Sequence, residues 1–243
     1  MSIERAVQAD NSLKLNLGTE QYIYDAFNDF IFSSDTRVLG KLLARNFLYN
    51  QVKDVPGDIV ECGVFKGSGI LTWLKLKKIF TPNSFRKVVG FDFFDTNSLL
   101  NSLSGNDRLR MSELFGERHY QHDEAAEQLL RDKIAAAGFA SSDYELVKGD
   151  ICKTAPEFAQ QRPGLRISLL YIDVDIEEPT YEILNAFWDK IAVGGIVAFD
   201  EYAVHQWSES DGADRFFKDK NLQIKATNDY FCPIAYVVKT SYN

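Results

Sequence analysis

A glycine-rich turn directly after an apolar strand is the feature that most constrains how this chain can fold. Residues 58–69 read DIVECGVFKGSG, with glycines at positions 63, 67 and 69. Glycines at such a turn let the backbone approach a ligand closely, and the helix that follows begins with unpaired amides. Open α/β sheets hold nucleotide-like cofactors at this point. The turn therefore predicts a cofactor site with these candidate contacts: Glu61, Cys62, Gly63, Gly67 and Ser68.

The spacing of the glycines narrows the kind of cofactor. It is G-x-x-x-G-x-G, whereas dinucleotide-binding turns have G-x-G-x-x-G. Phe65 stands where a second glycine would let a pyrophosphate lie on the backbone. The spacing argues against an NAD-dependent oxidoreductase and for a cofactor without a pyrophosphate. A turn that only joins a strand to a helix stays the alternative.

Apolar strands alternate with amphipathic helices along most of the chain. This alternation predicts a doubly wound, mostly parallel α/β sheet, and the last two strands would add an antiparallel hairpin at its edge. The helices expected in this core cover residues 68–80, 123–137, 179–191 and 212–218. We expect seven strands, at residues 58–62, 87–91, 144–148, 166–173, 194–199, 222–227 and 235–240.

Two segments lie outside this regular alternation. Helices predicted at residues 20–32 and 35–51 would form a helical cap (1–53) on a single α/β domain (54–243). This helix pair either caps a binding cleft or covers one face of the sheet. Residues 94–122 are polar and predict a long loop, which in a compact domain is usually functional or disordered.

Composition excludes several classes of partner. The formal net charge of −8 argues against nucleic acid, which needs a basic face. The chain has three cysteines without paired spacing, so we expect reduced thiols and a cytoplasmic protein. No apolar run has the length of a membrane helix, and the N-terminus lacks the apolar core of a signal peptide.

Acidic residues end two further strands. Asp92 follows the second strand, where a carboxylate can accept both ribose hydroxyls of a nucleoside, or else cap a turn. Asp150 ends the third strand and would lie beside an adenine ring, with Ile151 packed on it. These residues extend the predicted cofactor site beyond the glycine turn.

Four more carboxylates follow the fourth and fifth strands: Asp173, Asp175, Asp200 and Glu201. Parallel strands bring their carboxyl ends to one rim, where crowded carboxylates repel one another unless a cation binds. Oxygen ligands favour Mg²⁺ or Mn²⁺ over zinc. The alternative is that Asp173 or Asp175 caps the helix that follows.

The histidines are candidates of a different kind. His205, four residues after Glu201, lies near the predicted rim and could act as a general base, or it is a simple exposed loop residue. His119 and His122 fall in the 94–122 segment, where we expect them to face solvent or the substrate.

Three stretches of the sequence together resemble the macrocin O-methyltransferase family. They are residues 58–69, residues 173–180 (DVDIEEPT) and residues 194–202 (GGIVAFDEY), and the similarity spans residues 35–217. The resemblance implies a class I enzyme that uses S-adenosylmethionine and Mg²⁺ to methylate hydroxyls of sugars, often deoxysugars of antibiotics. The substrate would then be a sugar-containing small molecule, and a homo-oligomer stays open.

The resemblance also implies roles for individual cofactor contacts. Glu61, Gly63 and Gly67 would hold the methionine part of the cofactor. Asp92 would bind the ribose and Asp150 the adenine edge.

For the metal, the resemblance implies Asp173, Asp200 and the residue at position 201. Members of the family usually have Asp at this last position, where the present chain has Glu201. Related catechol-type methyltransferases carry a lysine where Ile176 stands, so a lysine base is excluded there. Asp173, which also adjoins the predicted cofactor site, or His205 would take the proton of the acceptor hydroxyl. Methylation of another small-molecule hydroxyl, or cofactor binding without catalysis, are the alternatives.

Overall fold

The computed structural model of the chain describes residues 18–117, 125–227 and 231–241. The chain divides into two compact units, and the division falls between Leu39 and Gly40. The strands are β1 Asp58–Cys62, β2 Val88–Asp92, β3 Tyr144–Lys148, β4 Ile167–Ile172, β5 Ile191–Phe199, β6 Lys225–Ala226 and β7 Ala235–Val238. The helices are α2 Gly18–Phe32, α3 Arg37–Val52, α4 Ser68–Phe80, α5 Thr96–Ser102, α6 Gly105–Glu117, α7 Ala126–Ala136, α8 Ile151–Gln161, α9 Glu177–Phe187, the 3₁₀ turn η1 Trp188–Lys190 and α10 Glu209–Phe217.

The second unit is built on one seven-stranded sheet, in the order β3-β2-β1-β4-β5-β7-β6. Strands β1 to β5 pair in parallel, whereas β7 pairs antiparallel with β5 and with β6. The doubly wound sheet and its antiparallel C-terminal hairpin are therefore confirmed. The strand order reverses between β1 and β4, and open α/β sheets bind their ligands at the carboxyl ends of the strands at such a switch point.

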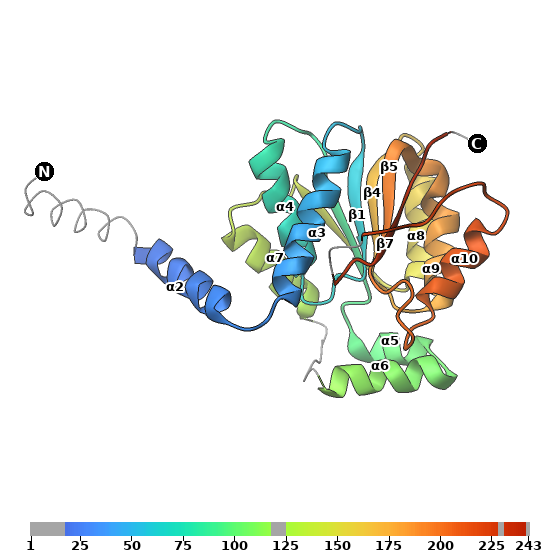
Figure 1. The fold of residues 1–243 in the computed structure, drawn as a ribbon, viewed down its shortest axis with the longest axis horizontal. Coiled ribbons are helices and arrows are strands. Elements are labelled where there is room, and N and C mark those ends of the chain that lie inside the picture. The colour runs from blue at the N-terminus through green and yellow to red at the C-terminus, as the bar shows by residue number, and fades with distance from the viewer. Residues whose placement is uncertain (1–17, 118–124, 228–230, 242–243) are drawn as a thin grey trace, which may run out of the picture. The chain divides into compact units, whose positions relative to one another are not determined.

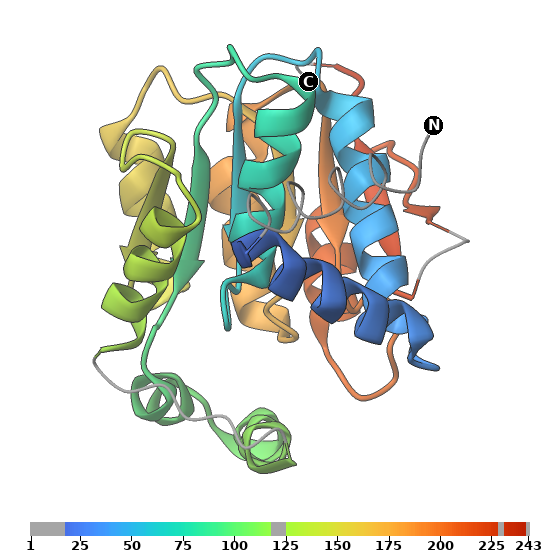
Figure 2. The same ribbon diagram turned by 90° about the vertical axis from the view of Figure 1, so that its left-hand side faces the viewer.

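Helices cover both faces of this sheet (Figure 1). The part of α3 in this unit lies on one face with α4 and α7, as Figure 2 shows from the side. Helices α8, α9 and α10 cover the other face. Each layer encloses its own apolar core, one around Trp73 of α4 and the other around Phe187 of α9. All six residues of β4 are buried because both faces of this central strand are covered.

The first unit contains α2, whose described apolar side chains are mostly exposed. Tyr24, Phe27 and Ile31, which recur at helical spacing, each expose 45% or more of their surface. The cap predicted over residues 1–53 stays a prediction. Within the α/β unit, α3 contributes Leu48, Tyr49 and other residues to the core.

The loop predicted over residues 94–122 is wrong as far as the structure describes it. The segment folds into α5 and α6, and Asp95 begins α5 by accepting a hydrogen bond from the amide of Asn97 (3.0 Å). His119 and His122 lie outside the described residues. Another helix, α8, is absent from the sequence prediction; it contains Pro156, which is usually unfavourable inside a helix.

Several boundaries also differ from the sequence prediction. Helix α9 begins at Glu177, two residues before the predicted proline start, and α10 begins at Glu209 instead of Gly212. Strand β6 is only two residues long. Among the described residues, no helix combines the length and the apolar character that crossing a bilayer requires.

Candidate active site

The first residues after β1, β4 and β5 lie side by side at the switch point. The amide of Asp173 donates to the carbonyl of Cys62 (2.8 Å), and the amide of Asp200 donates to the carbonyl of Ile172 (2.9 Å). The register that pairs Cys62 with Ile172, and Ile172 with Phe199, produces this arrangement. The sheet therefore brings the glycine turn, Asp173 and Asp200 to one rim, as the sequence predicted.

Close packing of the protein against itself explains two glycines of the turn. Gly63 has φ +91°, and a Cβ there would lie 1.8 Å from the main-chain oxygen of Asp173. A Cβ on Gly69 would lie 1.7 Å from Oε1 of Glu61. Position 63 thus lets two strand ends approach, and position 69 makes room for a carboxylate. Gly67, in the left-handed region at the N-cap of α4, turns the chain into the helix.

Glu61 lies beneath the turn, out of contact with solvent, and is paired with an arginine that the sequence prediction missed. Its Oε1 is 3.4 Å from Nη2 of Arg45, whose guanidinium lies over the rings of Trp73 and Tyr171. Burial raises the pKa of Glu61 to about 8, although Arg45 opposes this shift. Glu61 therefore supports the turn from below.

Asp92 and Cys62 hold the turn through the main chain. The Asp92 carboxylate accepts hydrogen bonds from the amides of Val64 and Phe65 (2.9 Å each) and of Phe94 (2.8 Å). The Cys62 side chain is fully buried in the core, which leaves only its main chain at the turn.

The remaining candidate cofactor contacts lie at the starts of two helices. Asp150 is the N-cap of α8, accepts from the amide of Cys152 (3.1 Å) and pairs with Lys153. Ile151 is buried in the core beside it. Ser68 is exposed at the start of α4.

A lysine bridges two carboxylates of the rim. Nζ of Lys41, on α3, lies 2.9 Å from Oδ2 of Asp200 and 3.3 Å from Oδ2 of Asp173. The buried Tyr171 hydroxyl donates to Oδ1 of Asp200. Burial raises the pKa of Asp173 to about 6, with Asp200 adding to the shift and Lys41 opposing it. Neither Lys41 nor Arg45 was predicted; the available signal was two cations, four residues apart, on a helix with an apolar face.

The loop after β5 carries Glu201, and a buried glutamate holds this loop in place. The amide of Glu201 donates to Oε1 of Glu209 (2.9 Å), a fully buried carboxyl whose Oε2 has no partner among the described residues. Burial, followed by the charge of Asp175, raises the pKa of Glu209 well above its ordinary value. Glu209 therefore anchors this loop, and the sequence prediction missed it.

Helix capping does not explain the acids of the rim. The N-cap residue of α9 is Ile176, and the helix has no side-chain cap; the amide of Glu177 instead donates to Oγ of Ser208 (2.9 Å). Asp175 lies in the left-handed region at φ +65°. Since neither Asp173 nor Asp175 caps the helix, that alternative is wrong.

The donor atoms on the rim fit a divalent cation. Oxygens of Asp200 and Glu201 and the sulfur of Cys232 lie within 4.8 Å of one another. Burial raises the pKa of the Cys232 thiol, with Asp200 adding to the shift. Sulfur is also the softer donor, so the carboxylates are the donors that a hard cation would use. Asp173 lies beside this group, because Lys41 contacts both Asp173 and Asp200. Such oxygen donors suit Mg²⁺ or Mn²⁺.

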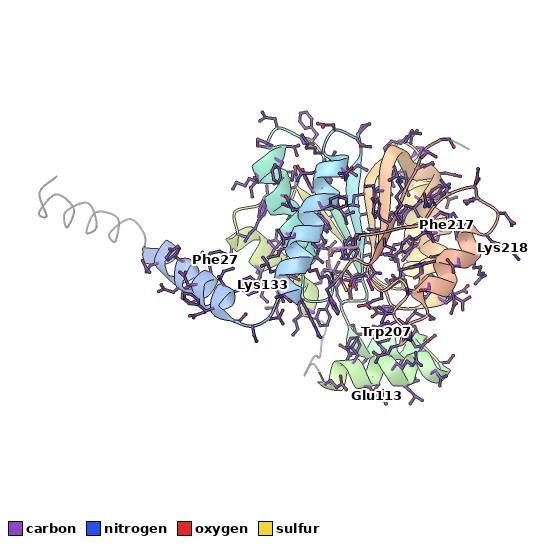
Figure 3. All side chains as sticks on the ribbon, viewed as in Figure 1. Phe27, Glu113, Lys133, Trp207, Phe217 and Lys218 are labelled. Atoms are coloured by element: carbon purple, nitrogen blue, oxygen red, sulfur yellow. The ribbon has the colours of Figure 1, made fainter. Side chains whose placement is uncertain are left out.

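Helices α5 and α6 lie at the carboxyl ends of the strands (Figures 1 and 2). Met111 and Phe115 of α6 form an apolar cluster with Ile176, against which Phe65 of the glycine turn and Trp207 pack. Trp207, in the loop after β5, lies beside these helices in Figure 3. His205, in the same loop, is exposed and has no hydrogen bond or ion pair to any described side chain. The cluster therefore joins α6 both to the glycine turn and to the loop after β5.

The strand order, the antiparallel C-terminal strands and the glycine turn at the switch point define a class I methyltransferase fold. Within this class, residues 44–229 match the Macrocin-O-methyltransferase (TylF) family, and the chain belongs to that family. No curated protein matches the sequence.

Solved structures of two methyltransferases, CalS11 and NovP, are similar over most of the chain. CalS11, described as a calicheamicin methyltransferase, is 26% identical with a TM-score of 0.71, and the match covers 98% of this chain and 93% of CalS11. Its apo structure, described as a TDP-rhamnose 3'-O-methyltransferase, is 25% identical with a TM-score of 0.71 over 98% and 95%. The O-methyltransferase NovP shares the fold, at 21% identity and a TM-score of 0.66 over 83% and 80%.

Proposed function

We propose that this protein is an S-adenosylmethionine-dependent O-methyltransferase that methylates a sugar hydroxyl with the help of a divalent cation. The observation that carries this proposal is the rim on which the glycine turn of a methyltransferase fold adjoins Asp173 and Asp200. The likeness to CalS11, which is described as acting on TDP-rhamnose, favours a nucleotide-linked sugar as the acceptor. A cytoplasmic location is part of the proposal, and the three free cysteines support it.

The cofactor would lie across the carboxyl ends of β1, β2 and β3. The main chain of the glycine turn would hold its methionine part, Asp92 the ribose, and Asp150 with Ile151 the adenine. Glu61 would act as a positioning residue, because its side chain is buried beneath the turn. When bound, the cofactor supplies a methyl group on a positively charged sulfur. The turn, braced by Glu61 and Asp92, would orient that methyl group toward the rim.

The acceptor sugar would bind between the rim and the α6 cluster. Asp173, Asp200 and Glu201 would hold the cation, which supplies Lewis acidity that lowers the pKa of the acceptor hydroxyl. Asp173 or His205 would accept the hydroxyl proton as the oxygen gains the methyl group. Helices α5 and α6 would exclude water from this space.

Methyl transfer to TDP-rhamnose, measured by mass spectrometry with a deuterated methyl donor, tests the proposal. We expect the sugar to gain the labelled methyl group, and a chelator to slow this transfer. Asp173→Ala should still bind the cofactor, but its turnover should fall by about a hundredfold or more and lose its response to Mg²⁺.

A matched variant distinguishes the two candidate bases. If His205 takes the proton, His205→Asn should lower turnover without affecting the response to Mg²⁺. If Asp173 takes the proton, His205→Asn should leave turnover unchanged. Cofactor binding without transfer to any hydroxyl acceptor in Mg²⁺ would contradict the proposal and favour a non-catalytic binding protein.

A further inference from the structure

We propose that Lys41 is a built-in counter-cation of the rim, which a divalent metal must displace in order to bind. This inference rests on the metal-assisted function proposed above and adds that Lys41 and the metal compete for the same carboxylates. Lys41 and the metal would occupy the same place in turn, so that the Lys41 ammonium closes the rim whenever no metal is bound.

The position of the Lys41 ammonium carries the argument. It contacts the Oδ2 atoms of Asp173 and Asp200 at 3.3 and 2.9 Å, which are direct charge-assisted hydrogen bonds. A metal bound by both carboxylates would lie between the same two oxygens. The other oxygen of Asp200 already accepts from the buried Tyr171 hydroxyl, so Oδ2, which faces Lys41, is the oxygen that Asp200 offers most readily.

No other described cation lies within ion-pair distance of these two carboxylates. Arg45, the next cation on α3, is committed to Glu61 and stacked on two aromatic rings. A lysine ammonium is a compact charge on a flexible four-carbon stem, and the Lys41 side chain is 32% exposed. Lys41 can therefore swing toward solvent when a doubly charged ion repels it, whereas Arg45 cannot.

Binding of Mn²⁺ alone, followed by the electron paramagnetic resonance signal of the free ion, measures the competition without cofactor or acceptor. Lys41→Met removes the charge and keeps an unbranched side chain, so we expect it to bind Mn²⁺ about tenfold more tightly, or better. Lys75→Met, which removes an exposed lysine from α4, should match the wild type. Equal or weaker Mn²⁺ binding by Lys41→Met, or no binding by either protein, would overturn the inference.

Lysine acetylation of the wild type, read by mass spectrometry, gives a second measurement that needs no variant. Mn²⁺ should increase the labelling rate of Lys41 at least severalfold and leave that of Lys75 unchanged, because only Lys41 is released. An unchanged Lys41 rate at saturating Mn²⁺ would contradict the displacement. Since neither experiment involves methyl transfer, the displacement of Lys41 can fail while the proposed methyl transfer stands. Absence of Mn²⁺ binding by either protein would remove only the metal assistance from the proposed function.

Discussion

The two halves of the site satisfy their carboxylates in different ways. Around the glycine turn, the protein itself supplies the partners: Arg45 for Glu61, and three main-chain amides for Asp92. On the rim, Asp173 and Asp200 share the one ammonium of Lys41. In the first half each carboxylate therefore has a protein partner, although Oε2 of the buried Glu61 has none among the described residues. The second half has more negative charge than the protein compensates.

This difference indicates that the glycine turn is held by internal contacts, whereas the rim changes its contacts when a cation binds. Substitutions around the turn should act mainly on folding, because its contacts are internal. Substitutions on the rim should act mainly on cation binding and turnover. The predictions below test this division, beginning with the largest expected effect.

Gly63→Ala should be the most damaging change in the turn. The new methyl carbon would lie 1.8 Å from the Asp173 oxygen, at a backbone φ of +91° that alanine rarely adopts. We expect the free energy of unfolding in urea to fall by about 3 kcal/mol or more. Gly116→Ala is the control, since a Cβ there meets nothing within 4 Å. Equal stability of the two variants would show that the strand ends are not tightly packed at position 63.

Arg45→Met should destabilise the protein by an amount that depends on pH. Because the pKa of Glu61 is about 8, Arg45 faces an ionised carboxylate mainly above that pH. We expect a loss of about 3 kcal/mol at high pH, where the charge is left unpaired, and a smaller loss at low pH. The double variant Arg45→Met, Glu61→Gln should lose this dependence on pH. A cost that is the same at every pH would mean that the arginine acts only by packing.

Glu209→Gln should change the pH dependence of stability in the opposite half of the site. The pKa of Glu209 in the folded protein lies well above the ordinary 4.5, so the folded state holds a proton that the unfolded state releases. The wild type must therefore lose stability as pH rises above 4.5, by up to about 1.4 kcal/mol per pH unit. Glutamine does not titrate, so the stability of the variant relative to the wild type should increase with pH.

Thermal or urea unfolding at several pH values measures this difference. The exposed Glu113 on α6 (Figure 3) provides the matched control, because Glu113→Gln should parallel the wild type. A Glu209→Gln curve that also parallels the wild type would show that Glu209 is ionised in the folded protein.

The sequence was sufficient for the sheet and for the place of the site. Apolar runs that end in or precede an acid mark β2, β4 and β5 in the sequence. Parallel pairing then brings Asp173 and Asp200 together without further information. The opposite case is the 94–117 segment. Helix α5 has only seven residues and α6 buries only Met111 and Phe115, so neither has the apolar stripe that identifies a helix in a sequence.

The cations of the site could not be predicted because their partners are distant along the chain. Lys41 lies 132 residues from Asp173 and 159 from Asp200. In the sequence, it is one of 27 lysines and arginines. Its one local signal, a second cation four residues further on, is equally typical of a solvated helix face. The buried Glu209 is hidden in the same way, since it stands at the start of a helix where acids are common.

Calorimetric titration with S-adenosylmethionine and, separately, with NAD tests the central claim most directly, because the glycine turn must distinguish these two cofactors. We predict saturable heat at one site with S-adenosylmethionine, weakened in Asp92→Asn, and no heat with NAD. Saturable heat with NAD and none with S-adenosylmethionine would contradict the account.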